Sequence, residues 1–182
     1  MNHKLSNVLR MLAAIACIMI LLGRAPHIET LGHTLLYAAS WITFLHICFG
    51  VYVFVRYLHA YSHAQQVLDT IAAGLLGACL FFFTRPTLWS AALAAFTGVA
   101  VIKYVLLYTK TSEPSLRHYI RDKLLLETPA AILVGLTASI FAFGDLPSWL
   151  TLGLQAALFA GTTAFAIWMI FIRHAYQKHN LQ

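Results

Sequence analysis

Charged residues are scarce in this chain of 182 residues. Asp, Glu, Lys and Arg together make up only 10% of it, whereas 60% is hydrophobic. A soluble domain carries roughly 25% charge, so the composition excludes a soluble globular protein and indicates an integral membrane protein. The length suits one compact bundle of helices without a separate soluble domain.

Cysteine is also rare. The three cysteines, Cys17, Cys48 and Cys79, each lie in a different apolar segment and none lies in a loop, so no disulfide framework is expected. The sequence lacks a glycine-rich phosphate loop, a zinc-protease helix motif and a nucleophile elbow. Nothing therefore points to the enzyme classes that these motifs define, and whether the protein is an enzyme stays open.

Six long apolar segments are present instead. They run over 8–23, 34–56, 67–84, 88–109, 124–143 and 149–172, and a membrane-spanning helix needs about 20 such residues. A signal peptide is the alternative for the first segment, but no small-residue cleavage site follows it, so we expect a retained helix. We predict an all-α bundle of six transmembrane helices that forms one domain over 1–182.

The basic residues predict the orientation of this bundle. Six spans place both termini and the loops 57–66 and 110–123 on one side, together with most of the Lys and Arg residues; the opposite side has only Arg24 and Arg85. The positive-inside rule then makes both termini cytoplasmic, and we expect a bacterial inner membrane. Anionic lipid headgroups account for the net charge of +6, so no nucleic-acid partner is needed.

The longest connection, "KTSEPSLRHYIRDK", carries apolar residues at Leu116 and Ile120, and Leu124 follows on the same helical face. We predict a short interfacial helix here, which lies along the membrane surface and then bends into the fifth span.

Two acids stand at the start of apolar segments, Asp69 in "LDTIAA" and Glu127 in "LETPAA". The shared pattern suggests that spans 3–4 and 5–6 are related hairpins. We expect both acids within about one turn of the cytoplasmic boundary, beside Arg56 and Lys103. Ion pairs among these four residues are the simplest interpretation, with Lys103 bound to a carboxylate. The alternative is a cluster that handles protons or cations.

Histidine is abundant, with nine residues, and only His46 lies in the middle of a span, two residues before Cys48. Cys17 and Cys79 fall at similar depths on other spans. Imidazole and thiol groups at one depth can hold Cu(I), but cysteines in a bundle also serve as small apolar residues.

His33 opens the second span, and His46 follows about 20 Å further along the helix. Stacked haem ligands can have such an interval, although thirteen residues leave these two side chains on different faces. In "RYLHAYSHA", His59 and His63 have the i, i+4 spacing that allows a shared metal or a haem edge. A solvated helix end is the alternative for this segment.

Spans two to five resemble the CopD and HemJ group of small membrane proteins. The resemblance rests on His33 and Trp41 in "GHTLLYAASW", on "FVRYLHAYSHA", on Lys103 in "VAVIKYVLLY" and on "LLETPAAILVG". The last segment is similar to HemJ-type protoporphyrinogen oxidases, and "SLRHYIRDKLLLE" before it is similar to CopD-type copper-resistance proteins. This chain differs in having an additional helix at each end. The resemblance implies binding of copper or b-type haem, with His33 as a ligand and Lys103 as a charged partner.

Three functional classes therefore remain. The first is a copper or haem protein, which we favour because it uses both the histidines and the resemblance. The second is a small proton- or ion-coupled transporter or channel built on Asp69, Lys103 and Glu127. The third is a non-catalytic subunit or scaffold, in a homo-oligomer or a larger membrane complex, whose aromatic runs "CLFFF" and "AFAIWMIFI" contact lipid or protein.

Overall fold

The computed structural model describes residues 3–57 and 63–180, with side chains described for 11–48 and 64–171 apart from 13, 66 and 115. These residues are almost entirely helical and include no strand, which confirms the all-α class. The elements are α1 (His3–Arg24), the short 3-10 helix η1 (Ala25–His27), α2 (Leu31–Tyr57), α3 (His63–Phe81), α4 (Pro86–Lys110), α5 (Pro114–Phe143) and α6 (Ser148–Asn180). Each predicted apolar segment falls on one helix.

Four of the described helices are long and apolar enough to cross a membrane. Their apolar windows are Leu31–Cys48, Pro86–Lys110, Leu116–Phe143 and Ser148–Phe171, and shorter apolar stretches lie at Ala14–His27 and Val67–Phe81. The structure thus supports an integral membrane protein of the helical type.

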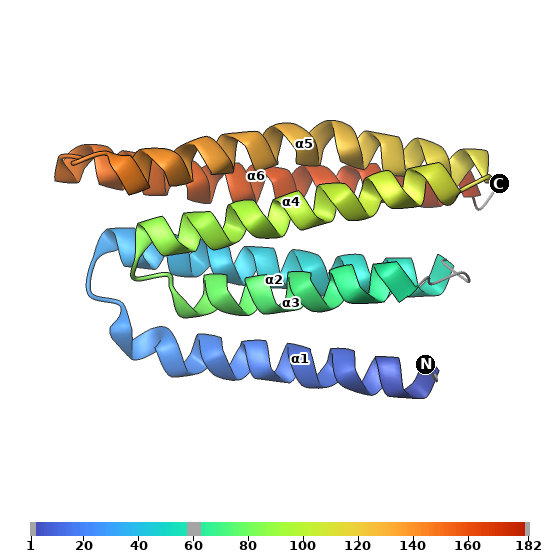
Figure 1. The fold of residues 1–182 in the computed structure, drawn as a ribbon, viewed down its shortest axis with the longest axis horizontal. Helices are drawn as coiled ribbons and strands as arrows, with labels where there is room; N and C mark the ends of the chain where they lie inside the picture. Colours follow the sequence, from blue (N-terminus) through green and yellow to red (C-terminus); the bar gives the residue numbers. More distant parts are fainter. Residues whose placement is uncertain (1–2, 58–62, 181–182) are drawn as a thin grey trace.

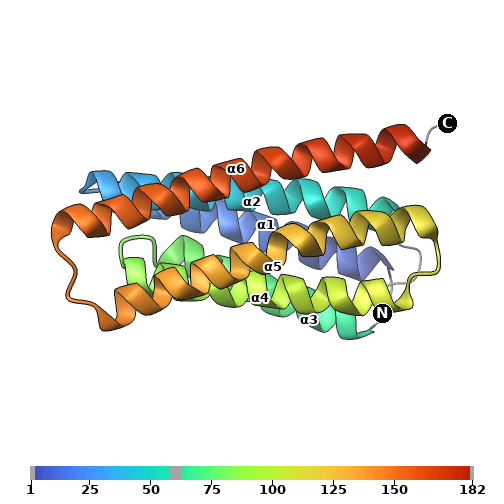
Figure 2. The same ribbon diagram turned by 90° about the horizontal axis from the view of Figure 1, so that it is seen from above.

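The helices lie side by side along one long axis (Figure 1). α4 packs between α3 and α5, α6 packs against α2 and α5, and α1 lies at the outer edge against α3 and α2. The start of α1, the end of α6 and the α4–α5 turn lie at the same end of the bundle (Figures 1 and 2). We call this the terminal end, and the end with η1, the α3–α4 turn and the α5–α6 connection the loop end.

The short interfacial helix predicted for the α4–α5 connection is wrong. α5 is a single helix from Pro114 to Phe143, and its first turns pack against α4 through one apolar cluster: Tyr104, Leu107, Leu116, Tyr119 and Ile120. Pro114 is well suited to the first turn of a helix, and no helix-breaking residue follows until Pro129. The apolar face that we assigned to the membrane surface is buried against α4.

The core of the loop end is apolar and closely packed. Phe83 and Trp89 are fully buried there, together with Leu36. The Trp89 indole donates a hydrogen bond of 2.9 Å to the Ser40 hydroxyl, which joins α4 to α2. Ser40 in turn donates to the Leu36 carbonyl, so both polar side chains of this contact between α4 and α2 are satisfied.

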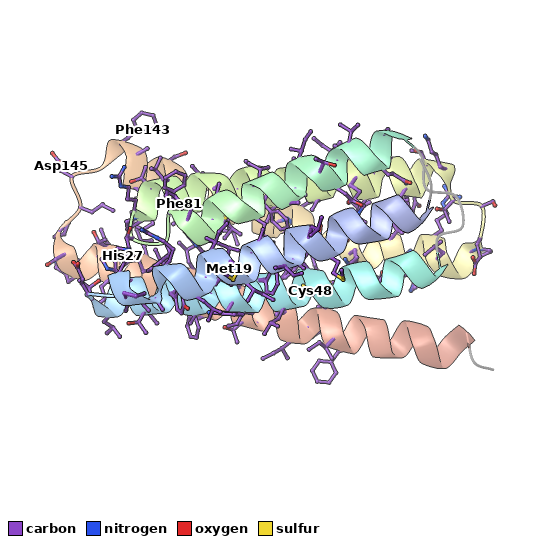
Figure 3. The ribbon with its side chains drawn as sticks, turned by 90° about the horizontal axis from the view of Figure 1, so that it is seen from below. Met19, His27, Cys48, Phe81, Phe143 and Asp145 are labelled. Carbon is purple, nitrogen blue, oxygen red and sulfur yellow. The ribbon has the colours of Figure 1, made fainter. Side chains whose placement is uncertain are left out.

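The outer faces of the helices are apolar as well. Exposed large side chains cover α1, α5 and α6, among them Met19, Leu125, Leu133, Trp149 and Phe143. Figure 3 shows Phe143 pointing away from the bundle. Such continuous apolar exposure suits contact with lipid rather than water.

Candidate functional site

Ionisable side chains meet inside the half of the bundle that is nearer the terminal end. Asp69 comes from α3, Lys103 and Tyr104 come from α4, and Lys123 and Glu127 come from α5; we call these five residues the buried charge cluster. The side chains of Lys123 and Glu127 are only 2% and 8% exposed. Ionisable groups inside a membrane bundle are rare and usually functional.

The helical repeat explains how the cluster forms. Lys123 and Glu127 are one turn apart and lie on one face of α5, which also carries Tyr119. Lys103 and Tyr104 are neighbours in the chain, so their side chains point about 100° apart around α4. Lys103 therefore reaches α3 while Tyr104 faces α5.

The predicted pairing of Lys103 with a carboxylate is observed, and the partner is Asp69. The Lys103 ammonium donates a hydrogen bond to Asp69 Oδ1, which ties α4 to α3. Their side chains are 15% and 27% exposed. This ion pair is therefore the outer part of the cluster, closer to solvent than the residues on α5.

Lys123 occupies the inner part. Its Nζ lies 3.6 Å from Glu127 Oε1, donates a hydrogen bond to the Tyr104 hydroxyl and lies 4.3 Å from the centre of the Tyr104 ring. Lys103 is also near enough to attract the Glu127 carboxylate. The cluster is thus one electrostatic unit across three helices.

One atom of the cluster has no hydrogen-bond partner in the described part of the chain. Glu127 Oε2 is buried and accepts no bond there. A buried carboxylate oxygen without a donor is costly, so this atom is the open hydrogen-bond acceptor of the cluster.

Glu127 is deeper than the sequence indicated. We placed it about one turn inside the boundary because we began the fifth span at Leu124. α5 begins at Pro114 instead, thirteen residues before Glu127, which corresponds to about 20 Å of helix. Glu127 therefore lies far inside the α4–α5 hairpin. Asp69 is closer to its helix start, six residues after His63.

Lys123 and Tyr104 were not among the predicted site residues. Lys123 lies in the segment that we predicted as a surface helix, and Tyr104 lies in the fourth apolar segment. The signal that could have found Lys123 is its i, i+4 spacing from Glu127, since an acid and a base at this spacing share a helix face. Nothing in the sequence marks Tyr104, because its role depends on which helix α5 contacts.

Three predicted site residues fall outside the described part of the structure. His59 lies between α2 and α3, outside the described residues. Arg56 and His63 belong to helix ends whose side chains are not described. Their predicted roles in the charge cluster and in a metal or haem site stay predictions.

The three cysteines do not come together. Cys17 and Cys48 belong to the apolar cluster that α1 forms with α2 and α3, whereas Cys79 packs in the loop-end core. All three are free thiols. Figure 3 shows Cys48 near the middle of the bundle.

The two histidines of α2 make aromatic contacts. The His46 ring lies 5.6 Å from the Phe165 ring of α6, and the His33 ring lies 6.4 Å from that of Phe83.

In the residues that the structure describes, no group of three or more His, Cys, Asp or Glu side chains is placed to hold a metal ion. Copper or haem binding stays a prediction.

A shallow surface hollow lies at the loop end, away from the cluster. Pro86 and Thr87 of α4 line it together with Gly144 and Asp145 of the α5–α6 connection. Its only ionisable lining group is Asp145, which is exposed. The hollow therefore offers little chemistry, and the charge cluster is the better candidate site.

The fold and the cluster define a class: a helical membrane protein with paired charges inside its bundle. No protein-family model, no curated protein and no solved structure matches this chain. The resemblance to the CopD and HemJ group thus rests on its motifs alone, and a function must be argued from the geometry of the cluster.

Proposed function

We propose that this chain is a membrane transport protein that carries protons across the bilayer, in which the buried charge cluster takes up and releases the proton. The observation that carries this proposal is the Lys123–Glu127 pair, which is almost fully buried and linked electrostatically to Lys103. Buried ion pairs often contribute little net stability and can be replaced by apolar residues. Four such charges in a membrane bundle therefore favour a functional role.

The charge balance of the cluster explains why a proton would matter. Two ammonium groups face two carboxylates, so the cluster is neutral when all four are ionised. A proton on one carboxylate leaves an excess positive charge among apolar helices, where charge interactions are strong. The excess charge favours rearrangement of the ion pairs, and this rearrangement couples proton uptake to helix movement.

The topology that we propose has six spans. α1 has 22 residues and α3 has 19, which correspond to about 33 Å and 28 Å of helix, close to the thickness of the hydrocarbon core. Both lie beside the longer helices. We place the terminal end, with both chain termini, on the cytoplasmic side of a bacterial inner membrane because the basic residues gather there.

Proton flux into vesicles tests the proposal. The purified chain is reconstituted into liposomes that contain a pH-sensitive dye, and a proton gradient is applied. The wild-type chain should acidify the lumen faster than protein-free vesicles, whereas Glu127→Gln should fall to the protein-free rate. Asp145→Asn is the matched control, because Asp145 is exposed at the loop end. Equal flux through wild type and Glu127→Gln would contradict the proposal.

The other two predicted functions have their own tests. Metal analysis and a visible absorption spectrum of the purified protein test for copper and b-type haem, and a spectrum without a Soret band in metal-free protein would remove that prediction. The exposed apolar faces of α5 and α6 suit lipid and a partner membrane protein equally. Purification from native membranes tests whether the chain is a subunit of a larger complex.

A further inference from the structure

Polarity is distributed unevenly along the bundle. The charged side chains that are buried in the described residues, Lys123 and Glu127, belong to the half nearer the terminal end, as do Lys103 and Asp69. The loop-end half is packed with Phe83, Trp89 and other apolar residues. Fourteen residues, or about 21 Å of α4, separate Trp89 from Lys103.

The loop-end half contains few buried polar groups. Gln155 is buried there, and Arg24 Nε is buried without a hydrogen-bond partner in the described residues. The hydroxyls of Ser40, Thr43 and Ser90 each donate to a backbone carbonyl one turn earlier in their own helix. These three hydroxyls therefore do not form a chain of donors through the described part of this half.

The exposure of the charge cluster falls in steps from outside to inside. The side chains are 27% exposed at Asp69 and 15% at Lys103, then 8% at Glu127 and 2% at Lys123. Asp69 is therefore the most accessible of the four charged groups. Glu127 is the innermost carboxylate, and its Oε2 is the acceptor without a hydrogen-bond donor in the described residues.

The charged groups around Glu127 come from α4 and α5. α4 contributes Lys103, which pairs with Asp69 of α3, and α5 itself contributes Lys123, which donates to the Tyr104 hydroxyl of α4. The described side chains of α6, which also packs against α5, include no charged group. The two ammonium groups stabilise an ionised Glu127, while its open Oε2 gives a proton a place to bind. A small rearrangement of the ammonium groups can therefore shift Glu127 between the two states.

We infer that the structure captures a one-sided loading state, in which a proton from water at the terminal end reaches Glu127 past Asp69 and Lys103 while the loop-end core closes the other side. The proton bonds to Oε2, the carboxylate becomes a neutral carboxylic acid, and Lys123 loses its counter-charge. This inference rests on the proposed transport function and specifies the side from which the site fills.

Infrared spectroscopy on oriented vesicles tests this inference. A protonated carboxyl group has a carbonyl stretch that the ionised form lacks, so a pH step on one side of the membrane reports which side reaches Glu127. Vesicle orientation is assigned with S112C, since Ser112 is exposed in the α4–α5 turn, by its reaction with an impermeant maleimide. The carbonyl band should grow at once when the side that carries position 112 is acidified, and only as fast as protons cross the membrane when the other side is.

Two variants assign the band. Glu127→Gln should remove it, and Glu127→Asp, which keeps a carboxyl group, should shift it. Asp145→Asn should leave it unchanged. A band that grows at once from the loop-end side, at once from both sides, or from neither would overturn the inference.

The vesicle flux assay distinguishes a failure of one-sided loading at Glu127 from a failure of the proposed transport function. One-sided filling of Glu127 without flux would leave the loading site in place and contradict transport. Flux together with a band that grows at once from both sides would support transport and overturn one-sided loading.

Discussion

At the scale of single residues, the main result concerns which charges pair. The sequence placed Arg56, Asp69, Lys103 and Glu127 near one boundary, and the structure joins Lys103 to Asp69. Glu127 instead takes Lys123, its neighbour one turn earlier on the same helix. Two pairs on three helices replace the single group that we expected, and each pair has a separate energetic test.

The inner pair can be tested by removing its cation. Lys123→Met leaves the Glu127 carboxylate buried without its nearest counter-charge and should lower the free energy of unfolding by about 3 kcal/mol. Adding Glu127→Gln to this variant should recover part of that loss, because the buried charge is then gone. Thermal unfolding of the purified proteins in detergent measures both effects.

A control for this series is Lys110→Met, at the exposed end of α4, which should unfold like wild type. If the losses of Lys123→Met and Glu127→Gln simply add in the double variant, the two residues do not interact.

The outer pair can be tested by a double-mutant cycle. Lys103→Met and Asp69→Asn should show a coupling of about 1 kcal/mol, because the two groups form a partly buried ion pair. The cycle of Lys103→Met with Glu127→Gln should give a smaller coupling, since these groups interact only at longer range. Unfolding in detergent again supplies the measurement, and a larger coupling to Glu127 than to Asp69 would contradict the observed pairing.

At the scale of helices, α5 decides where the site lies. Its continuous course from Pro114 sets Glu127 about 20 Å from the helix start, whereas a separate surface helix would have left it near the boundary. Pro129 removes one backbone donor inside α5, which weakens the helix two residues after Glu127. The α2–α6 contact is a second helix-scale feature, and it depends on a glycine.

Gly32 tests the approach of α2 to α6. A Cβ at this position would lie 2.1 Å from Oε1 of Gln155, and Gln155 is only 5% exposed, so its side chain has little room to move. Gly32→Ala should therefore lower the free energy of unfolding by about 1 kcal/mol. Gly23→Ala is the matched control, because nothing lies within 4 Å of its Cβ position. The prediction fails if both variants unfold at the wild-type temperature.

At the scale of the whole molecule, the number of spans sets the sidedness of the site. His27 and Asp145 lie at the same end of the bundle (Figure 3), and the α4–α5 turn lies at the other end (Figure 2). The two ends of the bundle lie on opposite sides of the membrane only if each of the six helices crosses it. Since the apolar stretches of α1 and α3 are shorter than the other four, their crossing needs a direct test.

Single cysteines at three exposed positions provide that test. H27C and D145C should react with an impermeant maleimide from one side of the membrane, and S112C should react from the other side. If α1 and α3 did not cross, positions 27 and 112 would share a side and position 145 would be opposite. The parent chain, whose cysteines lie among the helices, measures the background.

The sequence by itself determined the class and the elements of this protein. A bilayer requires each helix to satisfy its own backbone and to present apolar side chains outward, so composition and the length of apolar segments were enough to predict an all-α membrane protein and its helices. The ion pairing of Lys103 followed too, because a lone ammonium inside a bundle is costly.

Only the tertiary structure decided which charges pair and how deep they lie. Pairing depends on which helices are neighbours and on how each is rotated about its own axis. The residues of one apolar segment specify neither. The depth of Glu127 depends on α5 beginning at Pro114, which the apolar pattern could not distinguish from a surface helix because the same face of 114–123 suits a membrane surface and the side of α4. The packing of α5 against α4 resolved that choice, since it places Lys123 and Glu127 inside the bundle.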